Sequence, residues 1–235
     1  MLTEHDLNVK YDSDDPDVLE AYQHETKGQY KAAIEHYHKA LARNPELGIV
    51  HKHLGNAYYR LGIMDKAVEH LQIGSSLLPN FPTVHYELGL SYYRIGSIKK
   101  GLKSLSKVIE LDPEFLMAYY WAGILSYHCG HLNDAYKFFK HVTKTNPKFL
   151  IAFFHLGVSC LRLGLYEEAA EALLNVVNNN PESPSAFALL GDAYLNLNKR
   201  FDARSAYKKA LELDPDDIKA RNGLAHLDDF GETVI

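Results

Sequence analysis

The chain has 235 residues, of which 46% are hydrophobic and 23% charged, and its formal net charge is −5 at pH 7. This composition is typical of a soluble folded protein and argues against nucleic-acid binding, because the chain is not basic overall. No run of about 18 apolar residues occurs and the first residues are acidic, so neither membrane insertion nor a signal peptide is expected. Because Cys129 and Cys160 follow no disulfide or metal spacing, we expect a cytoplasmic protein.

A proline recurs every 34 residues without a slip. The six positions are Pro45, Pro79, Pro113, Pro147, Pro181 and Pro215. A fixed period of this length indicates a stacked array of repeats, each packed on its neighbours. Alignment on the prolines predicts an acidic segment 1–13, an array over 14–217, and a capping helix with a short tail over 218–235.

Each repeat is predicted to be a helical hairpin, because two apolar runs with helical spacing are separated by a turn. Repeats 1 to 6 cover 14–47, 48–81, 82–115, 116–149, 150–183 and 184–217. Places 8 and 20 of every repeat hold Ala or Gly, which would let the two helices approach closely. Place 15 is glycine in five repeats and Asn198 in the sixth, as suits a left-handed residue at a helix end. The prolines then end the second helix.

This pattern resembles the tetratricopeptide repeat. The shared features are the 34-residue period, small residues in places 8, 20 and 27, Gly in place 15 and Pro in place 32. Departures are mild: place 27 is valine in three repeats, and Phe201 stands one place after the family's usual aromatic. The resemblance covers 14–217 and implies an all-α, right-handed α-solenoid superhelix of six helix-turn-helix repeats, with a ligand site on the concave face.

Both ends of the array are predicted to be finished by polar residues. Asp17 and Glu20 in repeat 1 stand where later repeats carry His51, Leu54 or other larger side chains. A last helix at about 217–230 is expected to turn Ile218, Leu224 and Leu227 inward and its charged residues elsewhere. Such a polar outer side is what a terminal repeat needs to stay in solution.

In the family the first helix of each repeat lines the ligand site, and these places are unusually aromatic here. The candidate groove residues are Lys52, Asn56, Tyr59, Arg60, Tyr86, Tyr93, Arg94, Tyr120, Trp121, Tyr127, His128, Phe154 and Arg162. Tyr, Trp and Arg dominate binding hot spots. We therefore predict that a peptide segment of a partner protein lies along the groove, with its carboxylates or carbonyls bound by the arginines. The alternative is that the aromatics pack between helices and the arginines hydrate the rim.

Lys52 and Asn56 are similar to the first two members of the carboxylate clamp that grips chaperone tails. The rest of the clamp is missing, because Glu87 stands where an asparagine is wanted and Met117 and Trp121 replace a lysine and an arginine. Losing these charge-assisted hydrogen bonds would cost several kcal/mol, at about 1.5 to 3 kcal/mol each. Chaperone-tail binding is therefore not expected.

Catalysis and cofactor binding find no support in the sequence. It contains no phosphate-binding glycine loop, no nucleophile elbow and no H-E-x-x-H motif. His128, Cys129 and His131 lie close together without a visible fourth ligand, so no metal site is expected either.

A second hypothesis is self-assembly into a homo-oligomer. Residues 1–30 carry eight acidic and two basic residues, whereas residues 96–148 carry eight basic and four acidic ones. The acidic segment 1–13 or the cap of one chain would then bind the groove or the basic helices of another. The ending Thr233-Val234-Ile235 resembles a PDZ-domain ligand, although a frayed tail is the simpler expectation.

Overall fold

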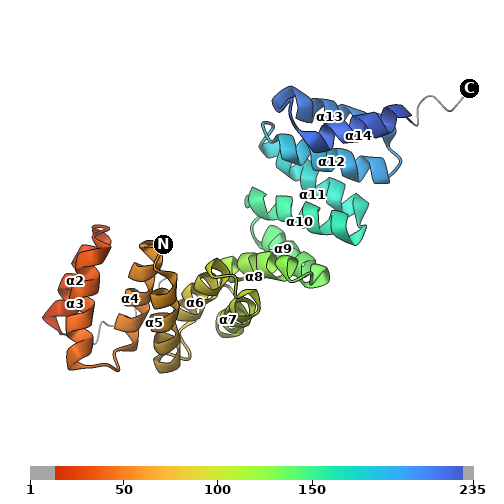
Figure 1. Cartoon of the computed structure of the whole chain (residues 1–235). Coiled ribbons are helices and arrows are strands. Elements are labelled where there is room, and N and C mark those ends of the chain that lie inside the picture. Colours follow the sequence, from red (N-terminus) through yellow and green to blue (C-terminus); the bar gives the residue numbers. More distant parts are fainter. Residues whose placement is uncertain (1–13, 230–235) are drawn as a thin grey trace, which may run out of the picture. The chain divides into compact units, whose positions relative to one another are not determined.

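The computed structural model describes residues 14–229, so the predicted acidic segment 1–13 and the Thr233-Val234-Ile235 tail lie outside the described residues. The described chain is an all-α solenoid of helical hairpins (Figure 1). The first helices of the six hairpins are α2 (Pro16–Thr26), α4 (Gly48–Arg60), α6 (Pro82–Arg94), α8 (Leu116–His128), α10 (Leu150–Leu163) and α12 (Pro184–Asn196). The second helices are α3 (Tyr30–Arg43), α5 (Met64–Leu77), α7 (Ile98–Leu111), α9 (Leu132–Thr145), α11 (Tyr166–Asn179) and α13 (Arg200–Leu213). The cap is α14 (Ile218–Asp229).

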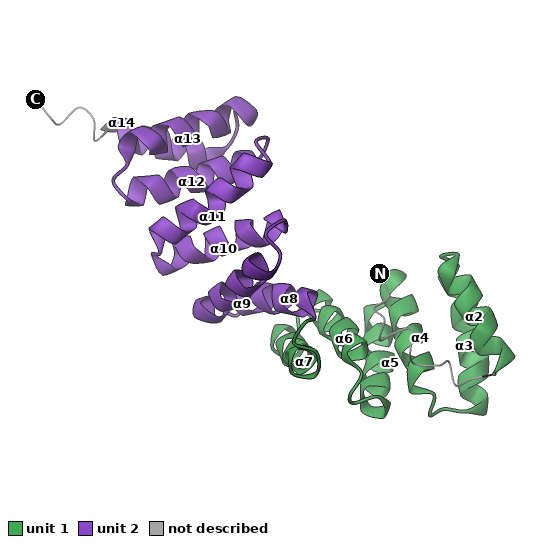
Figure 2. Ribbon diagram, turned by 180° about the vertical axis from the view of Figure 1, so that it is seen from behind, with its two compact units in different colours: residues 1–114 green, residues 115–235 purple. Residues whose placement is uncertain are grey.

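The chain divides into two compact units, residues 1–114 and 115–235 (Figure 2). The boundary falls at the end of repeat 3, so each unit contains three hairpins, and unit 2 also contains α14. Within each unit the two helices of a hairpin pack on each other, and the second helix packs on the first helix of the following hairpin.

Place 15 adopts the left-handed conformation that the sequence predicts. Gly62 ends its hairpin turn at φ +78°, and Asn198 occupies the same place at φ +58°. Glycine and, after it, asparagine tolerate this region best, so the single non-glycine repeat keeps the same turn.

The small residue at place 8 allows the close helix contact that was expected. A Cβ atom on Gly55 would lie 2.6 Å from Cγ of Leu71 and 3.1 Å from the carbonyl oxygen of Ala67. Gly191 approaches the ring of Tyr207 in the same way. These contacts fix how closely the first and second helices of a hairpin pack.

The residue before each proline has a non-helical backbone conformation that ends the second helix. In four repeats its side chain also accepts a hydrogen bond from the backbone beyond the proline. Asp112 is extended, at φ −139° and ψ 90°, because the following Pro113 disfavours helix there. Its Oδ1 accepts a hydrogen bond of 3.0 Å from the backbone N–H of Glu114, beyond the proline. Asn44, Asn146 and Asp214 make the equivalent bond.

The cap is helical as predicted, but its register differs from the prediction. Ala220 and Leu227 are buried against the ring of Tyr207 and its neighbours, whereas Ile218 is 71% exposed. The expectation that Ile218 faces inward was wrong, because the buried stripe starts two residues later, about 200° around the helix. Phe201, one place later than the family's aromatic, is likewise turned outward and leaves the fold unchanged.

Candidate functional site

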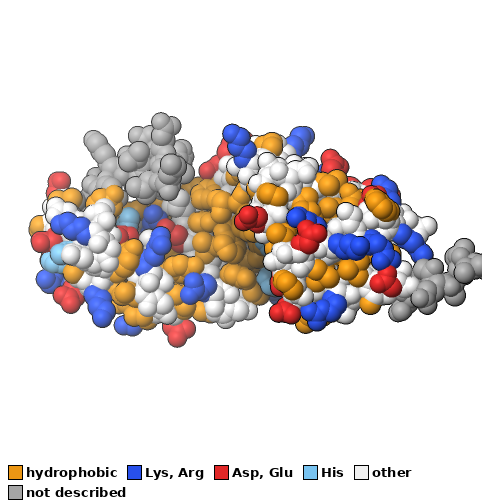
Figure 3. All heavy atoms as spheres, turned by 90° about the horizontal axis from the view of Figure 1, so that it is seen from above, with side chains coloured by type: hydrophobic (Ala, Val, Ile, Leu, Met, Phe, Trp, Pro, Cys, Tyr) orange, Lys and Arg blue, Asp and Glu red, His pale blue; other side chains and the backbone are white. Residues whose placement is uncertain are grey.

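The candidate groove residues divide between the two units, and each unit is described by itself. Unit 1 contains Lys52 to Arg94, on α4 and α6, and unit 2 contains Tyr120 to Arg162, on α8 and α10. A surface view shows hydrophobic side chains interspersed with charged ones over the visible face (Figure 3).

In unit 1, Glu25 of α2 lies at the centre of a buried polar network. Its Oε2 accepts hydrogen bonds from the Tyr37 hydroxyl at 2.6 Å and from Nδ1 of His53 at 3.0 Å. Asn56 donates to Oε1 at 3.4 Å. Burial alone would raise the pKa of Glu25, but the hydrogen bonds from His53 and Tyr37 lower it overall. The carboxylate is therefore ionised and holds three helices together.

Lys52, predicted to meet a ligand carboxylate, already has a carboxylate partner. Its Nζ lies 3.6 Å from Oε1 of Glu87, and the side chain is buried. Burial raises the pKa of Glu87, and its Oε2 has no hydrogen-bond partner among residues 14–229. Glu87 thus occupies the side chain of the lysine that a carboxylate clamp would need.

In unit 1, an exposed arginine of α6 stacks on a tyrosine of α4. The guanidinium carbon of Arg94 lies 5.4 Å from the ring centre of Tyr59, which is in the preceding repeat. Tyr59 is half-buried, while Arg94 and Arg60 are exposed. Tyr86 and Tyr93, on α6, are also half-buried. A cation on an aromatic face keeps the ring hydrated and also presents a fork of donors to solvent.

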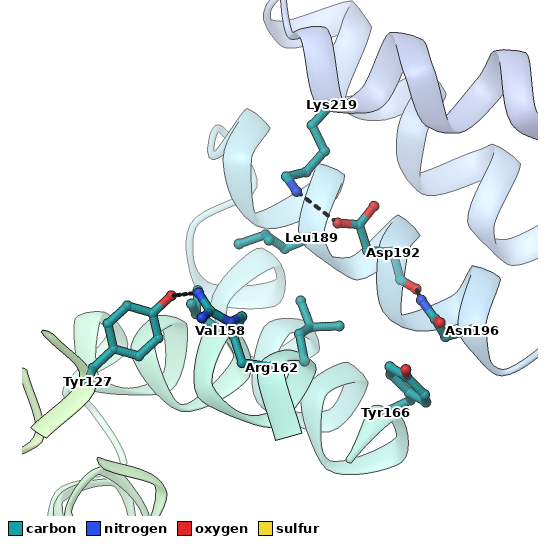
Figure 4. A pocket seen from close by; sticks show the side chains of 9 residues that line it. Tyr127, Val158, Arg162, Tyr166, Leu189, Asp192, Asn196 and Lys219 are labelled. Carbon is teal, nitrogen blue, oxygen red and sulfur yellow. Dashed lines mark hydrogen bonds and ion pairs between the residues drawn. The ribbon is translucent and has the colours of Figure 1, made fainter. Parts of the chain in front are cut away.

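Unit 2 repeats this arrangement beside a pocket of about 400 Å³ (Figure 4). Arg162 lies over the ring of Tyr127, with its guanidinium carbon 5.6 Å from the ring centre, and donates to the Tyr127 hydroxyl at 3.2 Å. Lys219 of the cap donates to Oδ2 of Asp192 at 3.0 Å. The pocket is lined by Tyr127, Val158, Leu161, Arg162, Tyr166, Leu189, Asp192, Asn196 and Lys219.

Among the other aromatic candidates of unit 2, Tyr120 packs against rings from outside its own helix, whereas Trp121 and Phe154 each contact a ring adjacent in sequence. Tyr120 contacts Phe149 at a ring-centre distance of 5.1 Å, and Trp121 at 5.6 Å. Phe154 makes an edge contact with His155 at 5.7 Å. These three candidates are half-buried, whereas His128 is exposed. Part of the predicted aromatic set therefore supports the helices, as the alternative interpretation proposed.

The acids that organise the binding residues of both units were not predicted from the sequence. Glu25 stands at place 12, where the next three repeats carry tyrosine, and this break in the pattern was a visible signal. Asp192 accepts a hydrogen bond of 2.7 Å from the buried Tyr207 as well as the one from Lys219. Lys219 lies in the cap, outside the repeat alignment, so nothing in the 34-residue pattern pointed to it.

None of the helices described in residues 14–229 combines the length and the apolar character that crossing a bilayer requires.

Comparisons with known proteins agree with the helical-hairpin solenoid. A TPR repeat model matches residues 26–62, and tetratricopeptide repeat models match 82–115 and, in overlapping copies, 130–186 and 156–218. The chain belongs to the tetratricopeptide repeat family. A search of curated proteins finds no significant match.

Several solved structures are similar to this chain in fold. YrrB, described as a TPR protein with an unusual peptide-binding site, aligns at TM-score 0.76 and 20% identity, covering 80% of this chain and 97% of YrrB. MamA from Desulfovibrio magneticus RS-1 aligns at TM-score 0.67 and 20% identity, covering 73% and 97%. A chain of the APC/C hetero-tetramer Cut9-Hcn1 aligns at TM-score 0.61 and 15% identity, covering 90% and 42%.

Proposed function

We propose that this protein is an interaction module that binds a peptide segment of a partner protein on the first helices of its repeats. Membership of the tetratricopeptide repeat family supports a role as a protein–protein interaction scaffold. The similar protein YrrB is described as having an unusual peptide-binding site. No cofactor is invoked.

The arginine stacked on a tyrosine is the observation that carries this proposal. Arg94 on Tyr59 and Arg162 on Tyr127 have the same geometry in two separate units. In each pair the ring is half-buried and the guanidinium exposed. An exposed guanidinium whose plane is already fixed by a ring has less freedom to lose when it binds a carboxylate or carbonyl.

The pocket of unit 2 favours an apolar side chain next to an acidic or carbonyl group. Val158, Leu161 and Leu189 supply apolar walls, and Arg162 supplies donors at the edge. Asp192 already accepts hydrogen bonds from Lys219 and Tyr207. Its charge is therefore compensated and does not repel an acidic peptide.

In unit 1, we propose that the peptide contacts Arg94, whose exposed guanidinium lies over the half-buried ring of Tyr59. Tyr86 and Tyr93 remain proposed peptide contacts of unit 1, and Tyr120, Trp121, His128 and Phe154 remain proposed peptide contacts of unit 2.

Binding of a short peptide by these contacts is expected to be micromolar. A dissociation constant of 1 μM corresponds to about −8 kcal/mol, which two aromatic anchors and one or two arginine contacts can supply after ordering costs.

The test uses a random peptide library displayed on phage and selected on the immobilised full chain. Selected peptides are then synthesised, and their affinities for the wild type, Tyr127→Ala and Arg162→Ala are measured by fluorescence anisotropy. We expect each substitution to weaken binding by at least tenfold, as hot-spot truncations of about 2 kcal/mol do.

Matched controls exist on α9 of the same unit, where Lys140 lies over Tyr136 at 4.8 Å. This is also a cation on an aromatic ring, but on a second helix rather than a first. Tyr136→Ala and Lys140→Ala should therefore leave peptide affinity unchanged. Equal losses in both pairs, or no loss in either, would refute the proposed site.

Self-assembly remains the alternative function, and no described contact favours it over peptide binding. Three lysines of the basic helices α7 and α9 are paired within the chain: Lys107 with Glu110 at 2.9 Å, Lys137 with Asp134 at 3.7 Å and Lys140 with Glu168 at 2.8 Å. Light scattering over a range of concentrations in low salt separates the two functions, because assembly through charged surfaces would raise the mass.

A further inference from the structure

The first hairpin brings one glutamate and two histidines together across α2 and α3, which pack side by side (Figure 1). Glu20 and His24 are four residues apart on α2, so they lie on the same side of that helix. His36 comes from α3. One ligand atom from each of the three side chains lies within 4.8 Å of the other two. Within residues 14–229, no other group of three or more His, Cys, Asp or Glu side chains meets this condition.

In both histidines, Nδ1 makes a hydrogen bond to a neighbouring side chain. Nδ1 of His24 lies 2.6 Å from Oε1 of Gln29, and Nδ1 of His36 lies 2.7 Å from Oδ1 of Asp17. An amide oxygen and a carboxylate oxygen accept hydrogen bonds, so the Nδ1 atoms donate. The lone pair of each neutral ring is then on Nε2. The two rings stack at a centre distance of 5.6 Å and an angle of 19°.

The acceptor behind His36 is itself fixed and charged. Nη2 of Arg43 lies 2.6 Å from Oδ2 of Asp17, and Arg43 also binds Asp15. A carboxylate hydrogen-bonded to the far nitrogen of a histidine is the usual support of a metal-binding histidine, because it fixes the ring and raises its basicity.

We propose that Glu20, His24 and His36 form a binding site for a divalent transition-metal ion, with zinc as the best fit. Two imidazoles and one carboxylate are the donor set of open zinc sites, whereas calcium and magnesium prefer oxygen ligands alone. Tetrahedral zinc needs ligand atoms about 3.3 Å apart, given bonds of about 2.0–2.1 Å. The exposed Glu20 can approach the ion by rotating its side chain.

Metal binding at this site would tie α2 to α3 and leave a coordination position open. Three protein ligands leave the fourth position of a tetrahedral ion to water or to a donor from a partner. Because the three ligands are assembled only when the hairpin is folded, the ion would stabilise the folded chain by mass action. Sequence spacing does not reveal this set, because His36 follows His24 by twelve residues across a turn.

The experiment titrates the metal-free full chain with Zn²⁺ in competition with a fluorescent zinc chelator. We expect one tight site per chain, with affinity lowered at least tenfold in Glu20→Gln, His24→Gln and His36→Gln. Asp17→Asn should weaken binding less than His36→Gln does, since Asp17 positions a ligand and does not bind the ion. The thermal midpoint should rise with Zn²⁺ in the wild type but not in the three ligand variants.

His141→Gln is the matched control, because His141 is an exposed helical histidine in unit 2 that stacks on Tyr119. It should bind Zn²⁺ like the wild type. Circular dichroism in EDTA checks that each variant is folded, and the absorption spectrum of the Co²⁺-loaded wild type reports tetrahedral ligation independently of any variant. Equal zinc affinity in the wild type and all three ligand variants, or a Co²⁺ spectrum of the hydrated ion, would overturn the proposal.

Discussion

Arg162 stacks on Tyr127, a residue of the preceding repeat, and donates a hydrogen bond of 3.2 Å to its hydroxyl. Arg94 and Tyr59 are related in the same way. The stacked pairs thus join place 12 of one repeat to place 13 of the next. Sequence neighbours such as Tyr59 and Arg60 are not the pair, because adjacent residues on a helix diverge by about 100°.

Replacing Arg162 by lysine tests whether the stacked guanidinium matters beyond its charge. Lysine keeps the charge but loses the planar fork that lies on the ring. We expect Arg162→Lys to weaken binding of the selected peptides by about 1 kcal/mol, roughly fivefold. The free energy of unfolding should change by less than about 0.5 kcal/mol. Arg204→Lys, at the exposed pair with Asp228, is the control that should not alter affinity. Full affinity in Arg162→Lys would mean that charge alone suffices.

A methyl group at place 8 should destabilise the first unit. In Gly55→Ala the new Cβ would fall 2.6 Å from Cγ of Leu71, so α4 and α5 must move apart. We expect a loss of about 1–3 kcal/mol in the free energy of unfolding, measured by urea denaturation. Leu71→Ala alone should cost about 2–5 kcal/mol, but the double variant should lose less than the sum, because the smaller side chain removes the collision.

Gly62→Ala is the contrasting substitution in the same hairpin. No atom lies within 4 Å of its added Cβ, but its φ is +78°, so the cost comes from the backbone alone. We expect a loss of about 1 kcal/mol that adds to that of Leu71→Ala without any compensation. Compensation at Gly62 as large as at Gly55 would contradict the packing explanation.

The sequence could predict the hairpins and their turns because each depends on local rules repeated every 34 residues. Gly62 and Asn198 end the first helices as expected, and Asp112 before Pro113 ends a second helix. Ile218 and Phe201 were harder, because a shift of one or two places changes the side of the helix that a residue faces.

The site could be predicted in its residue types but not in its pairs. Lys52 binds Glu87 and Arg162 binds Tyr127 at a separation of 35 residues, one residue more than a full repeat. Inspecting neighbouring places within one helix cannot reveal such partners. These partners become visible only in the structure, where the first helices of successive repeats lie next to each other.

Acidification should destabilise unit 1 through His70. Its ring stacks on Tyr58 at 5.6 Å, and its Nδ1 lies 3.0 Å from Nδ1 of His51. Burial, and then the charges of His51, His38 and Lys66, lower the pKa of His70 to about 4. The unfolded chain takes up this proton near pH 6.5, so the folded state loses stability as the pH falls from 6.5 towards 4.

His70→Gln removes this titration and serves as the test. The difference in unfolding free energy between the wild type and His70→Gln should shrink on going from about pH 7.5 to about pH 4.5, measured by urea denaturation at both values. Comparing the two proteins cancels the acids that titrate in the same range, such as Glu25 and Glu87. A pH dependence of the same size in His70→Gln would contradict the assignment.

Tyrosine replaces leucine or phenylalanine at place 24 in the first and last repeats, and both tyrosines bind an acid of their own hairpin. Tyr37 donates to Glu25 at 2.6 Å, and Tyr207 donates to Asp192 at 2.7 Å. Both rings are fully buried, and burial, followed by the bond to Asp192, raises the pKa of Tyr207. Phe139 fills the same place in repeat 4, so a phenylalanine ring fits there.

Tyr207→Phe should therefore cost the hydrogen bond without a packing defect. We expect a loss of about 1.5–3 kcal/mol in unfolding free energy, as for a bond to a charged group, measured by urea denaturation. Asp192 would keep Lys219 at 3.0 Å, which limits the loss. In a double-mutant cycle with Asp192→Asn the two losses should not add, because both substitutions weaken the same bond. Additive losses would show that the tyrosine stabilises the last repeat through its ring and not through its hydroxyl.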